Sequence, residues 1–462
     1  MTETTSIIST LGDGDTVHRC EMLLPGPIDP VRAAAAMRGN GRILLGTSDA
    51  SGRQPGTLAV GELALISRGL SSEQNQCPQE GALDEAVRFL ESLQFAPAAM
   101  PEERRWFGVI SYDAVRDIER LKPRADQGLP VYDFFIPEVI IRFEPGAVRV
   151  IGRGDSRRSA VRACARVGRL LVEANPCRLQ TPRAGRARFT LKRSDYDEAL
   201  QQAKRHIVDG DIFQVVLSLG LIAESEADGL AIYEALVSVN PSPYQFWYRS
   251  RQFEVVGCSP EPCVTLGGGR AKIRPLAGTR PRGADAAADQ LAERELRNSE
   301  KELAEHRMLV DLARNDLGRV CTPGTISVPE LMEVERYSHV MHLMSHVTGE
   351  LHSGRTAAEL ISATFPAGTM TGAPKVRAME IIDELEPVDR ALYSGAVGSF
   401  GLDDVDLYLT IRSIVVHQGR VRLQAGGGIV HDSDAATEHA ECLAKLGAAA
   451  RAIGIDMDRA AR

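Results

Sequence analysis

Two predicted helices each carry a pair of carboxylates on one face. Glu302 and Glu305 are three residues apart in one helix, and Glu438 and Glu441 are three apart in the last helix of the chain. Residues at this spacing are neighbours on a helix surface. Mg²⁺ takes one or two protein carboxylates and keeps positions for water and an anionic ligand. The spacing is also typical of a solvated helix face, so by itself it leaves both interpretations open.

Two glycine-rich segments are candidates for binding an anion. Gly426, Gly427 and Gly428 follow a predicted strand, and three glycines allow a ligand to approach backbone N–H groups closely. Residues 365–375 combine glycine and threonine ahead of a predicted helix, whose N-terminus favours an anion. A tight turn would explain the first segment, and a capped loop would explain the second.

The composition excludes several classes of partner. Of the 462 residues, 44% are hydrophobic and 25% are charged, and the net charge is -8. No basic excess indicates nucleic acid or a membrane surface, and no apolar run of about 20 residues predicts a membrane span. Eight cysteines without a C-x-x-C pair are typical of reduced thiols. Since the N-terminus also lacks a signal-peptide pattern, we expect a cytoplasmic protein.

The elements that must position these groups divide the chain into four parts. Residues 1–20 are polar and irregular, and residues 21–175 predict an N-terminal α+β region. Residues 176–190, rich in Pro, Arg and Gly, predict a linker, and residues 191–455 predict the catalytic domain. Because runs of strands precede helices without strict alternation, the pattern favours an α+β fold with antiparallel sheets.

Individual elements are predicted from turn and periodicity signals. Glu144, Pro145 and Gly146 join two strand-like runs as a hairpin. Ser194 to Tyr196 predict the start of a helix that closes at Gly210. Further strands are predicted near 212–224, 252–280 and 394–430, and further helices near 156–175, 299–317, 376–385 and 435–453.

Nine segments, taken together and in order, resemble the motif series of the chorismate-utilising enzymes, and most closely the anthranilate synthase large subunit. The resemblance is dense over 190–453 and thinner before it. It implies two large antiparallel β-sheets packed as a sandwich with helices outside, chorismate as substrate and Mg²⁺ as cofactor. The segments read GDIFQVVLS, CSPEP, PLAGTRPRG, EKELAEHRMLVDLARNDLGRV, VERYSHVMHLMSHVTGEL, FPAGTMTGAPKVRAMEIIDELEP, YSGAVGSF, IRSIVV and LQAGGGIV.

The resemblance implies a role for each motif residue. Glu305 and Glu441 would bind Mg²⁺, with Glu302 and Glu438 beside them, and the metal would hold the ring carboxylate of chorismate. Lys445 and the turn at Gly426, Gly427 and Gly428 would assist at the carboxylates. Tyr393 and Arg412 would hold the enolpyruvyl carboxylate, and Thr369 would contact the substrate. Glu261 would be the general acid for the C4 hydroxyl, and His342 would assist the later elimination.

Two positions indicate which nucleophile attacks. Relatives that add water at C2 carry a lysine where this chain has Gln214, and a glutamine cannot deprotonate water. Relatives that form a covalent bond to the ring carry a lysine where this chain has Ala277. Both positions favour direct attack by ammonia. Since no glutaminase segment is present, we expect ammonia from a separate glutaminase subunit in a hetero-oligomer.

Three functions remain open. The enzyme carries the reaction through to anthranilate, or it stops at the intermediate aminodeoxyisochorismate, as relatives in specialised pathways do. A non-catalytic relative that only binds chorismate is a third alternative, against which the intact motif residues argue.

The chain departs from the family pattern where the family senses tryptophan. An expected L-L-E-S motif reads Leu44-Leu45-Gly46-Thr47, and an expected N-P-S-P-Y-M motif ends in Tyr244-Gln245. An acidic residue and a methionine are thus replaced. The hypothesis is that tryptophan inhibits this chain weakly or not at all.

Overall fold

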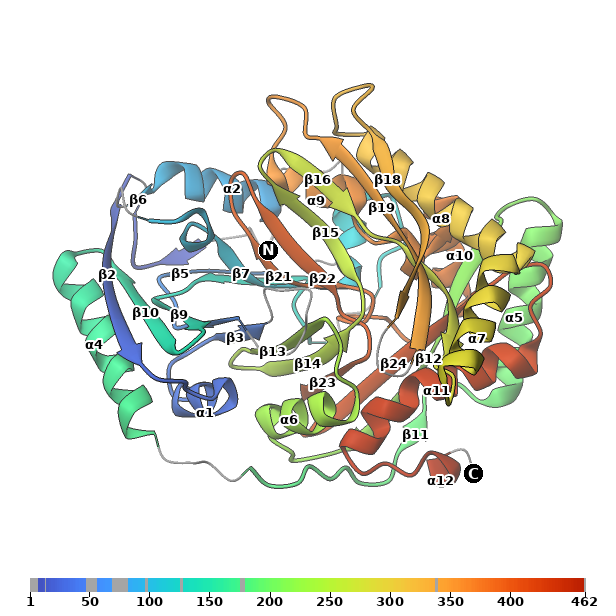
Figure 1. Ribbon diagram of the computed structural model, residues 1–462, viewed down its shortest axis with the longest axis horizontal. Helices are drawn as coiled ribbons and strands as arrows, with labels where there is room; N and C mark the ends of the chain where they lie inside the picture. Colours follow the sequence, from blue (N-terminus) through green and yellow to red (C-terminus); the bar gives the residue numbers. More distant parts are fainter. Residues whose placement is uncertain are drawn as a thin grey trace.

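Two large β-sheets pack face to face, and helices cover their outer faces (Figure 1). The computed structural model describes residues 7–12, 14–46, 56–68, 82–95, 99–124, 128–174, 179–336 and 340–460. All strand pairings among them are antiparallel except that of β2 with β6. The predicted α+β sandwich of two antiparallel sheets is therefore confirmed.

The first sheet has eleven strands among the described residues, in the order β1-β5-β8-β7-β21-β22-β15-β16-β19-β17, with β18 paired to β19. Their bounds are β1 Ile7–Ser9, β5 Ala64–Arg68, β7 Trp106–Ile110, β8 Tyr132–Ile136, β15 Pro262–Gly267, β16 Arg270–Ile273, β17 Leu276–Pro281, β18 Ser327–Arg336, β19 Val340–Glu350, β21 Ala396–Phe400 and β22 Val405–Leu409.

The second sheet has thirteen strands among the described residues, in the order β11-β12-β24-β23-β14-β13-β3-β4-β9-β10-β2-β6, with β20 paired to β12. Their bounds are β2 Thr16–Pro25, β3 Ile43–Gly46, β4 Thr57–Val60, β6 Gln94–Phe95, β9 Val139–Glu144, β10 Ala147–Gly154, β11 Arg188–Phe189, β12 Gln214–Glu224, β13 Tyr244–Arg249, β14 Phe253–Ser259, β20 Gly372–Ala373, β23 Ser413–His417 and β24 Arg420–Ile429.

The helices lie outside both sheets (Figure 1). Those of the first half are α1 Pro30–Ala36, α2 Ala82–Ser92, α3 Val115–Ile118 and α4 Arg157–Glu173, with 3-10 turns η1 Pro101–Glu103 and η2 Tyr112–Ala114. Those of the second half are α5 Arg193–Val208, α6 Gly229–Val239, α7 Ala286–Asn298, α8 Glu300–Gly318, α9 Ala357–Thr364, α10 Lys375–Leu385, α11 Ala435–Ala452 and α12 Met457–Ala460, with the 3-10 turn η3 Gly368–Met370. None of the described helices is both long and apolar enough to cross a membrane.

Aromatic side chains fill the space between the sheets. Phe135 of β8 and Tyr248 of β13 come from opposite sheets, and their ring centroids are 6.3 Å apart. Both are fully buried, as are Phe246 and Val255 in the same cluster. Burying one such large apolar side chain stabilises the fold by about 1.5–3 kcal/mol, so this layer holds the two sheets together.

Both halves of the chain contribute strands to both sheets. β7 of the first half pairs with β21 of the second, and β3 pairs with β13. The predicted linker at 176–190 therefore does not coincide with a break in either sheet. Where it is described, residues 179–187 have no helix or strand and run along the outside of the molecule (Figure 1).

Most predicted elements are present, with local differences. The predicted hairpin is formed by β9 and β10, with Gly146 at φ 76° in its turn, and the helix predicted at 156–175 is α4, capped by a Ser156–Ser159 capping box. The predicted cap at Ser194 is wrong, because Lys192 stands at the N-cap of α5 without a side-chain hydrogen bond. Six cysteines carry free thiols, and Cys77 and Cys177 lie outside the described residues.

Candidate active site

Glu261 lies in the short connection between β14 and β15 and is only 6% exposed. Its backbone carbonyl accepts hydrogen bonds from Ser259 Oγ at 3.1 Å and from Leu409 N at 3.1 Å. Thr369 Oγ1, in η3, donates to Glu261 Oε1 at 2.9 Å. The predicted general acid and one predicted substrate contact therefore meet directly, although they are 108 residues apart in the chain.

Burial raises the pKa of Glu261 to about 8. The hydrogen bond from Thr369, the charge of Arg274 and the N–H of Leu276 act in the opposite direction, because they favour the carboxylate. The effect of burial on the pKa is larger than these opposing effects, so Glu261 carries its proton at neutral pH. A cavity of about 20 Å³ lies against Glu261, Thr369 and Asp316, which is room for one water molecule but not for bulk solvent.

His342 is in β19, 9% exposed, and its Nδ1 lies 3.2 Å from the carbonyl oxygen of Gly278. A carbonyl only accepts, so Nδ1 carries the hydrogen and Nε2 carries none. Burial is the main cause that lowers the pKa of His342 to about 4; the hydrogen bond to Gly278 acts in the opposite direction, and the charges of the nearby Arg412, Arg274 and Lys445 act with burial. The imidazole is therefore neutral at pH 7 and has a basic nitrogen.

Gly426, Gly427 and Gly428 lie inside β24, not in a turn, so the predicted turn is wrong. They pair with Ser218, Leu217 and Val216 of β12. The backbone groups that face β12 are therefore used in the sheet ladder, whereas β23 pairs with β24 only as far as Leu423 and leaves the other edge of the glycine segment without strand pairing among the described residues. The glycines also matter for the space that they leave.

A side chain from another part of the site lies close to each of the three glycines, in the space where a Cβ would be. A Cβ added at Gly426 would lie 3.0 Å from the Tyr393 hydroxyl oxygen, and one at Gly428 would lie 2.3 Å from Gln214 Nε2. At Gly427 it would lie 3.0 Å from Glu438 Oε2. At Gly426 the Cβ would also lie 2.7 Å from the backbone oxygen of Leu217, which excludes a side chain there, and at Gly428 a side chain would displace the Gln214 amide from its present position. The glycine run therefore brings a tyrosine, a glutamine and a carboxylate to one strand.

Gln214 opens β12 and is 6% exposed, and its buried Oε1 has no hydrogen-bond partner among the residues that the structure describes. A buried acceptor left without a partner is destabilising by about 1–3 kcal/mol. This oxygen is therefore available to accept a hydrogen bond from a bound ligand.

Tyr393 and Arg412 lie close together, since the phenol and the guanidinium influence one another electrostatically. Arg412 has φ 50°, a conformation that non-glycine residues rarely adopt. No carboxylate of the described chain lies within ion-pairing distance of it, and burial lowers its pKa while Glu441 acts in the opposite direction. An Arg in this situation suits a bidentate carboxylate ligand.

Lys445 connects the glycine strand to the carboxylate helices. Its Nζ donates to the carbonyl oxygen of Gly426 at 2.8 Å and pairs with Glu441 at 2.7 Å. Lys445 and Glu441 are i,i+4 on α11, which points both side chains the same way. The lysine therefore stands between the strand and the proposed metal ligands.

The four predicted metal-site carboxylates lie on α8 and α11. Burial raises the pKa of Glu305 to about 7, Lys301 opposes this, and the charges of Glu302, Glu438 and Glu441 add to it. Among the described residues, Glu305 Oε1 has no hydrogen-bond partner, and Lys301 Nζ lies 3.8 Å from it. A buried carboxylate whose pKa is raised by neighbouring negative charges is in the environment that a divalent cation would relieve.

The carboxylates on α8 and α11 would fit Mg²⁺ as a site with one or two protein ligands. Within the described part of the chain, no three His, Cys, Asp or Glu side chains converge to hold a metal by themselves. Mg²⁺ commonly uses one or two carboxylates with water and an anionic ligand. All four carboxylates have a polar partner: Glu302 pairs with Arg280 at 3.0 Å and Glu438 accepts from Ser433 Oγ at 2.7 Å, while Glu305 lies 3.8 Å from Lys301 and Glu441 pairs with Lys445 at 2.7 Å. Partners therefore do not choose between them, and the choice of Glu305 and Glu441 as ligands stays with the family resemblance.

The structure adds two arginines that the sequence interpretation missed. Arg274, 8% exposed and paired with Glu335, influences both Glu261 and His342. Arg390, 2% exposed, stacks over Tyr393 at 5.8 Å. Arg274 directly precedes the motif that begins at Pro275, and Arg390 stands three residues before Tyr393, so proximity in the sequence was the available signal.

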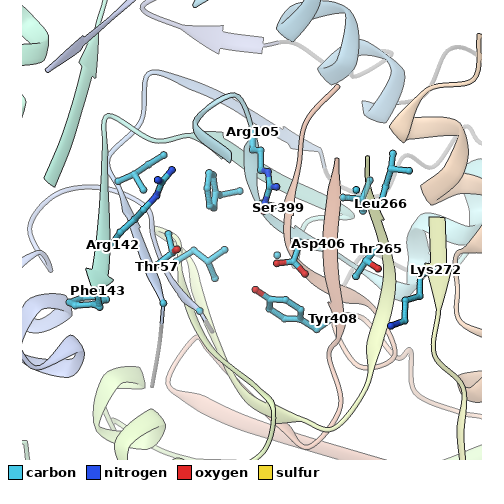
Figure 2. A pocket seen from close by; sticks show the side chains of 18 of the residues that line it. Thr57, Arg105, Arg142, Phe143, Thr265, Leu266, Lys272, Ser399, Asp406 and Tyr408 are labelled. Carbon is cyan, nitrogen blue, oxygen red and sulfur yellow. Dashed lines mark hydrogen bonds between the residues drawn. The ribbon is translucent and has the colours of Figure 1, made fainter. Parts of the chain in front are cut away.

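A second, wider cavity lies between the two sheets, away from these residues (Figure 2). Its volume is about 780 Å³, and Arg105, Arg142, Lys272, Asp406 and Tyr408 are among the side chains that line it. Arg105 Nε is 2.6 Å from Asp404, and Arg142 is 3.6 Å from Glu103. The wide cavity is thus lined by charges that are already paired in part.

The described residues of the two segments in which this chain departs from the family pattern, at 44–47 and at Tyr244-Gln245, lie at the wide cavity. Leu44 and Gly46 line it directly. Tyr244 stacks on the lining Tyr408, with ring centroids 5.1 Å apart and planes inclined by 19°. Thr47, the last residue of the first segment, lies outside the described residues.

Comparisons with known proteins identify the family of the chain. The chorismate binding enzyme family matches residues 48–451. Anthranilate synthase component 1 of Thermus thermophilus is 44% identical over 354 residues, 75% of this chain and 76% of the relative. That of Pseudomonas putida is 37% identical over 399 residues, 81% of this chain and 80% of the relative.

Two solved structures share the fold. Anthranilate synthase component I from Streptococcus pneumoniae has a TM-score of 0.73 at 27% identity and covers 97% of this chain and 95% of its own. The menaquinone-specific isochorismate synthase from Escherichia coli has a TM-score of 0.76 at 20% identity, with 96% of each chain covered. By its family match and its relatives, this chain belongs to the chorismate-binding enzyme family that includes anthranilate synthase component 1.

Proposed function

We propose that this chain aminates chorismate at C2 with ammonia, in the presence of Mg²⁺, and then eliminates pyruvate to give anthranilate. The observation that carries the proposal is the protonated, buried Glu261 held by Thr369, in a site where a glutamine stands in place of the lysine base. A carboxylic acid with a pKa near neutrality is suited to general-acid work.

Substrate binding uses the cations and the carboxylate helices. Arg412 and Tyr393 hold the enolpyruvyl carboxylate, and Lys445 supports the ring carboxylate. Glu305 and Glu441 would hold Mg²⁺, which supplies positive charge to that ring carboxylate when bound. The unsatisfied Glu305 oxygen and the unpaired Arg412, in the described chain, support this assignment.

In the first step, the C2–N bond forms and the C4–O bond breaks while the ring double bonds shift. Glu261 gives its proton to the departing hydroxyl, which leaves as water. The product is aminodeoxyisochorismate. The nitrogen bound at C2 passes its surplus proton to water, and the Glu261 carboxylate takes up a proton from water, so charge and the acid are both restored. Gln214 accepts a hydrogen bond from the incoming ammonia through Oε1, because no described residue donates to that oxygen.

In the second step, the C2–H and C3–O bonds break, and the ring becomes aromatic. His342 accepts the C2 proton at Nε2, which carries no hydrogen in the tautomer fixed by Gly278. The enolpyruvyl group leaves and gains a proton to become pyruvate. The low pKa of His342 keeps it a base throughout the neutral range.

Ammonia would come from a separate glutaminase subunit, so the working enzyme would be a hetero-oligomer. Several relatives bear the name anthranilate synthase component 1, which implies a second component. Free ammonium at mildly alkaline pH should replace that subunit in the test tube.

Product analysis tests the proposal. The purified chain is incubated with chorismate, Mg²⁺ and ammonium, and the products are separated by mass. Equal amounts of anthranilate and pyruvate are expected. A product that retains the enolpyruvyl group would identify an aminodeoxyisochorismate synthase, and no Mg²⁺-dependent turnover at all would overturn the assignment.

A further inference from the structure

Arg390 is a buried cation at the meeting point of three segments that carry substrate-facing residues. Its Nη1 donates to the carbonyl oxygen of Met370 at 2.6 Å, and its Nη2 donates to that of Val216 at 2.7 Å. Met370 directly follows Thr369, and Val216 stands two residues after Gln214. One guanidinium therefore joins η3 to β12.

The remaining donors of Arg390 fix its own orientation. Nε and Nη2 donate to the two carboxylate oxygens of Glu386 at 2.9 and 2.7 Å. Glu386 Oε1 also accepts from the backbone N–H of Ser218 at 2.8 Å. The guanidinium lies between the rings of Tyr112 and Tyr393, at 5.0 and 5.8 Å from their centroids. Arg is the side chain whose fixed fork can satisfy all these partners together.

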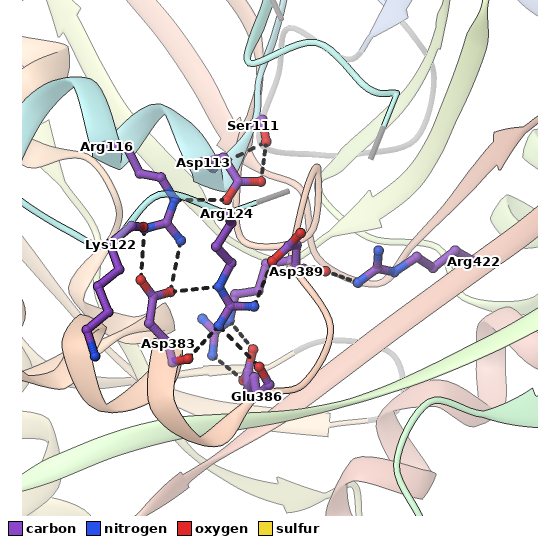
Figure 3. Close-up of polar contacts among 10 residues, drawn as sticks. Ser111, Asp113, Arg116, Lys122, Arg124, Asp383, Glu386, Asp389 and Arg422 are labelled. Atoms are coloured by element: carbon purple, nitrogen blue, oxygen red, sulfur yellow. Dashed lines mark hydrogen bonds and ion pairs between the residues drawn. The ribbon is translucent and has the colours of Figure 1, made fainter. Parts of the chain in front are cut away.

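An outer layer of ion pairs holds the segment that carries Glu386 and Arg390 (Figure 3). Arg116 makes a bidentate pair with Asp383 at 2.8 and 2.9 Å. Arg124 bonds Asp389 at 2.7 Å and the carbonyl oxygen of Glu386 at 3.1 Å. Arg116 thus stabilises the same segment without touching η3 or β12, which makes it a matched control.

We propose that Arg390 is a positioning residue, which holds Thr369 against Glu261 through the Met370 carbonyl and fixes β12 and Tyr393 at the same time. It touches no reacting atom. Its loss would loosen the contact between Thr369 and the acid, so its effect would appear in the ionisation of Glu261 as well as in the rate. This inference rests on the proposed function.

Several groups face Glu261, and the test must separate the effect of Thr369 on its pKa from the effects of the others. They are Thr369 from η3, Arg274 ahead of β17, Tyr244 from β13 and Cys263 from β15. Of these, only Thr369 is held by Arg390 through its neighbouring carbonyl. Since the Thr369 hydrogen bond favours the carboxylate, loosening it raises the pKa of Glu261.

The experiment compares Arg390→Lys, Arg116→Lys and Thr369→Val with the wild type, using chorismate, Mg²⁺ and ammonium over a range of pH. We expect Arg390→Lys to lower kcat by about 10- to 100-fold, because a small misplacement near the chemistry has that effect. It should also move the high-pH loss of activity upward, in the same direction as Thr369→Val. Arg116→Lys should lower the melting temperature without changing the pH at which activity is lost, which is the high-pH limb of the pH–rate profile.

A double variant sharpens the result. If Arg390 acts through Thr369, adding Thr369→Val to Arg390→Lys should move the limb little further, because coupled residues are not additive. If Arg390→Lys does not fold, Glu386→Gln weakens the hold on Arg390 and should give a smaller shift in the same direction.

Two results would overturn the inference. One is a folded Arg390→Lys variant whose kcat is near that of the wild type and whose high-pH limb does not move. The other is a loss of kcat in Arg116→Lys that equals the loss in Arg390→Lys. A wild type without turnover would instead count against the proposed function, so the two failures are distinguishable.

Discussion

The narrow site at Glu261 and the wide cavity between the sheets belong to one sandwich, but they handle charge differently. The cavity at Glu261 measures about 20 Å³, and burial keeps a proton on the acid. The wide cavity measures about 780 Å³, and its Arg105 and Arg142 have carboxylates near them. A closed space shifts pKa values toward what proton transfer needs, whereas an open one leaves room for a ligand.

The two regions also differ in how the sequence treats them. The motif residues implied by the family resemblance are all present around Glu261, His342 and Arg412. The departures from the family pattern fall at Gly46, which lines the wide cavity, and at Gln245, next to Tyr244 that stacks on its wall. Tyr244 connects the two regions, because it stacks on the cavity wall and also lies near Glu261. The predictions below test how far the chemistry and the wide cavity are separate.

The largest effect is expected for Glu261→Gln. The amide cannot donate a proton to the C4 hydroxyl, so kcat should fall by about 10²- to 10⁴-fold, as measured by anthranilate and pyruvate release. The control is Glu144→Gln at the wide cavity, where the carboxylate pairs with Arg149 at 2.6 Å. If the control lost activity to a similar extent, the two regions would not be separate.

A smaller effect is expected at the proposed metal ligands. Glu305→Gln and Glu441→Gln should raise the Mg²⁺ concentration for half-maximal rate by at least about tenfold, since each removes a charged ligand. Glu300→Gln, an exposed carboxylate in the first turn of the same helix, is the matched control. An unchanged Mg²⁺ requirement in both ligand variants would remove Mg²⁺ from this pair.

The pH dependence of the wild type should report the desolvated acid. Below a pKa of about 8 Glu261 holds its proton, and above it the acid form falls about tenfold per pH unit. The rate per free ammonia molecule should follow this loss as pH rises. Initial rates corrected for free ammonia provide the measurement, and a rate that stays flat above pH 9 would contradict the assignment of Glu261 as the acid.

The smallest effect is expected for tryptophan. With the family's acidic residue replaced by Gly46 and its methionine by Gln245, we expect less than about twofold inhibition at about 100 µM, a concentration that would fill a micromolar site. An inhibition curve with chorismate near its KM checks this. Micromolar inhibition would mean that the wide cavity retains the family's sensitivity despite the departures.

The sequence could predict much of the fold because its local patterns are strong. The alternation before and after Gly146 predicted a hairpin that β9 and β10 form, and the periodicity near residue 300 predicted α8. It could not predict that β3 pairs with β13 or that β7 pairs with β21. Pairings between distant strands leave no local signal, so the division into two regions did not reveal that both share each sheet.

The site shows the same limit. Glycines 426 to 428 were expected in a turn, but β12 pairs along their length and they remain in a strand. Their absent side chains make room for Gln214 and Tyr393, two residues from other parts of the chain. The pattern identified the residues, and tertiary packing determined what they are for.

The sequence by itself determined which chemical groups this protein possesses, namely an acid at 261, a histidine at 342, carboxylate pairs on two helices and an arginine at 412. Only the tertiary structure decided the protonation state of Glu261, the tautomer of His342 and the partners of Arg390. The reason is physical. A pKa depends on burial and on groups such as Thr369, 108 residues away, and a guanidinium that spans 174 residues to Val216 has no partner until the sheets have assembled.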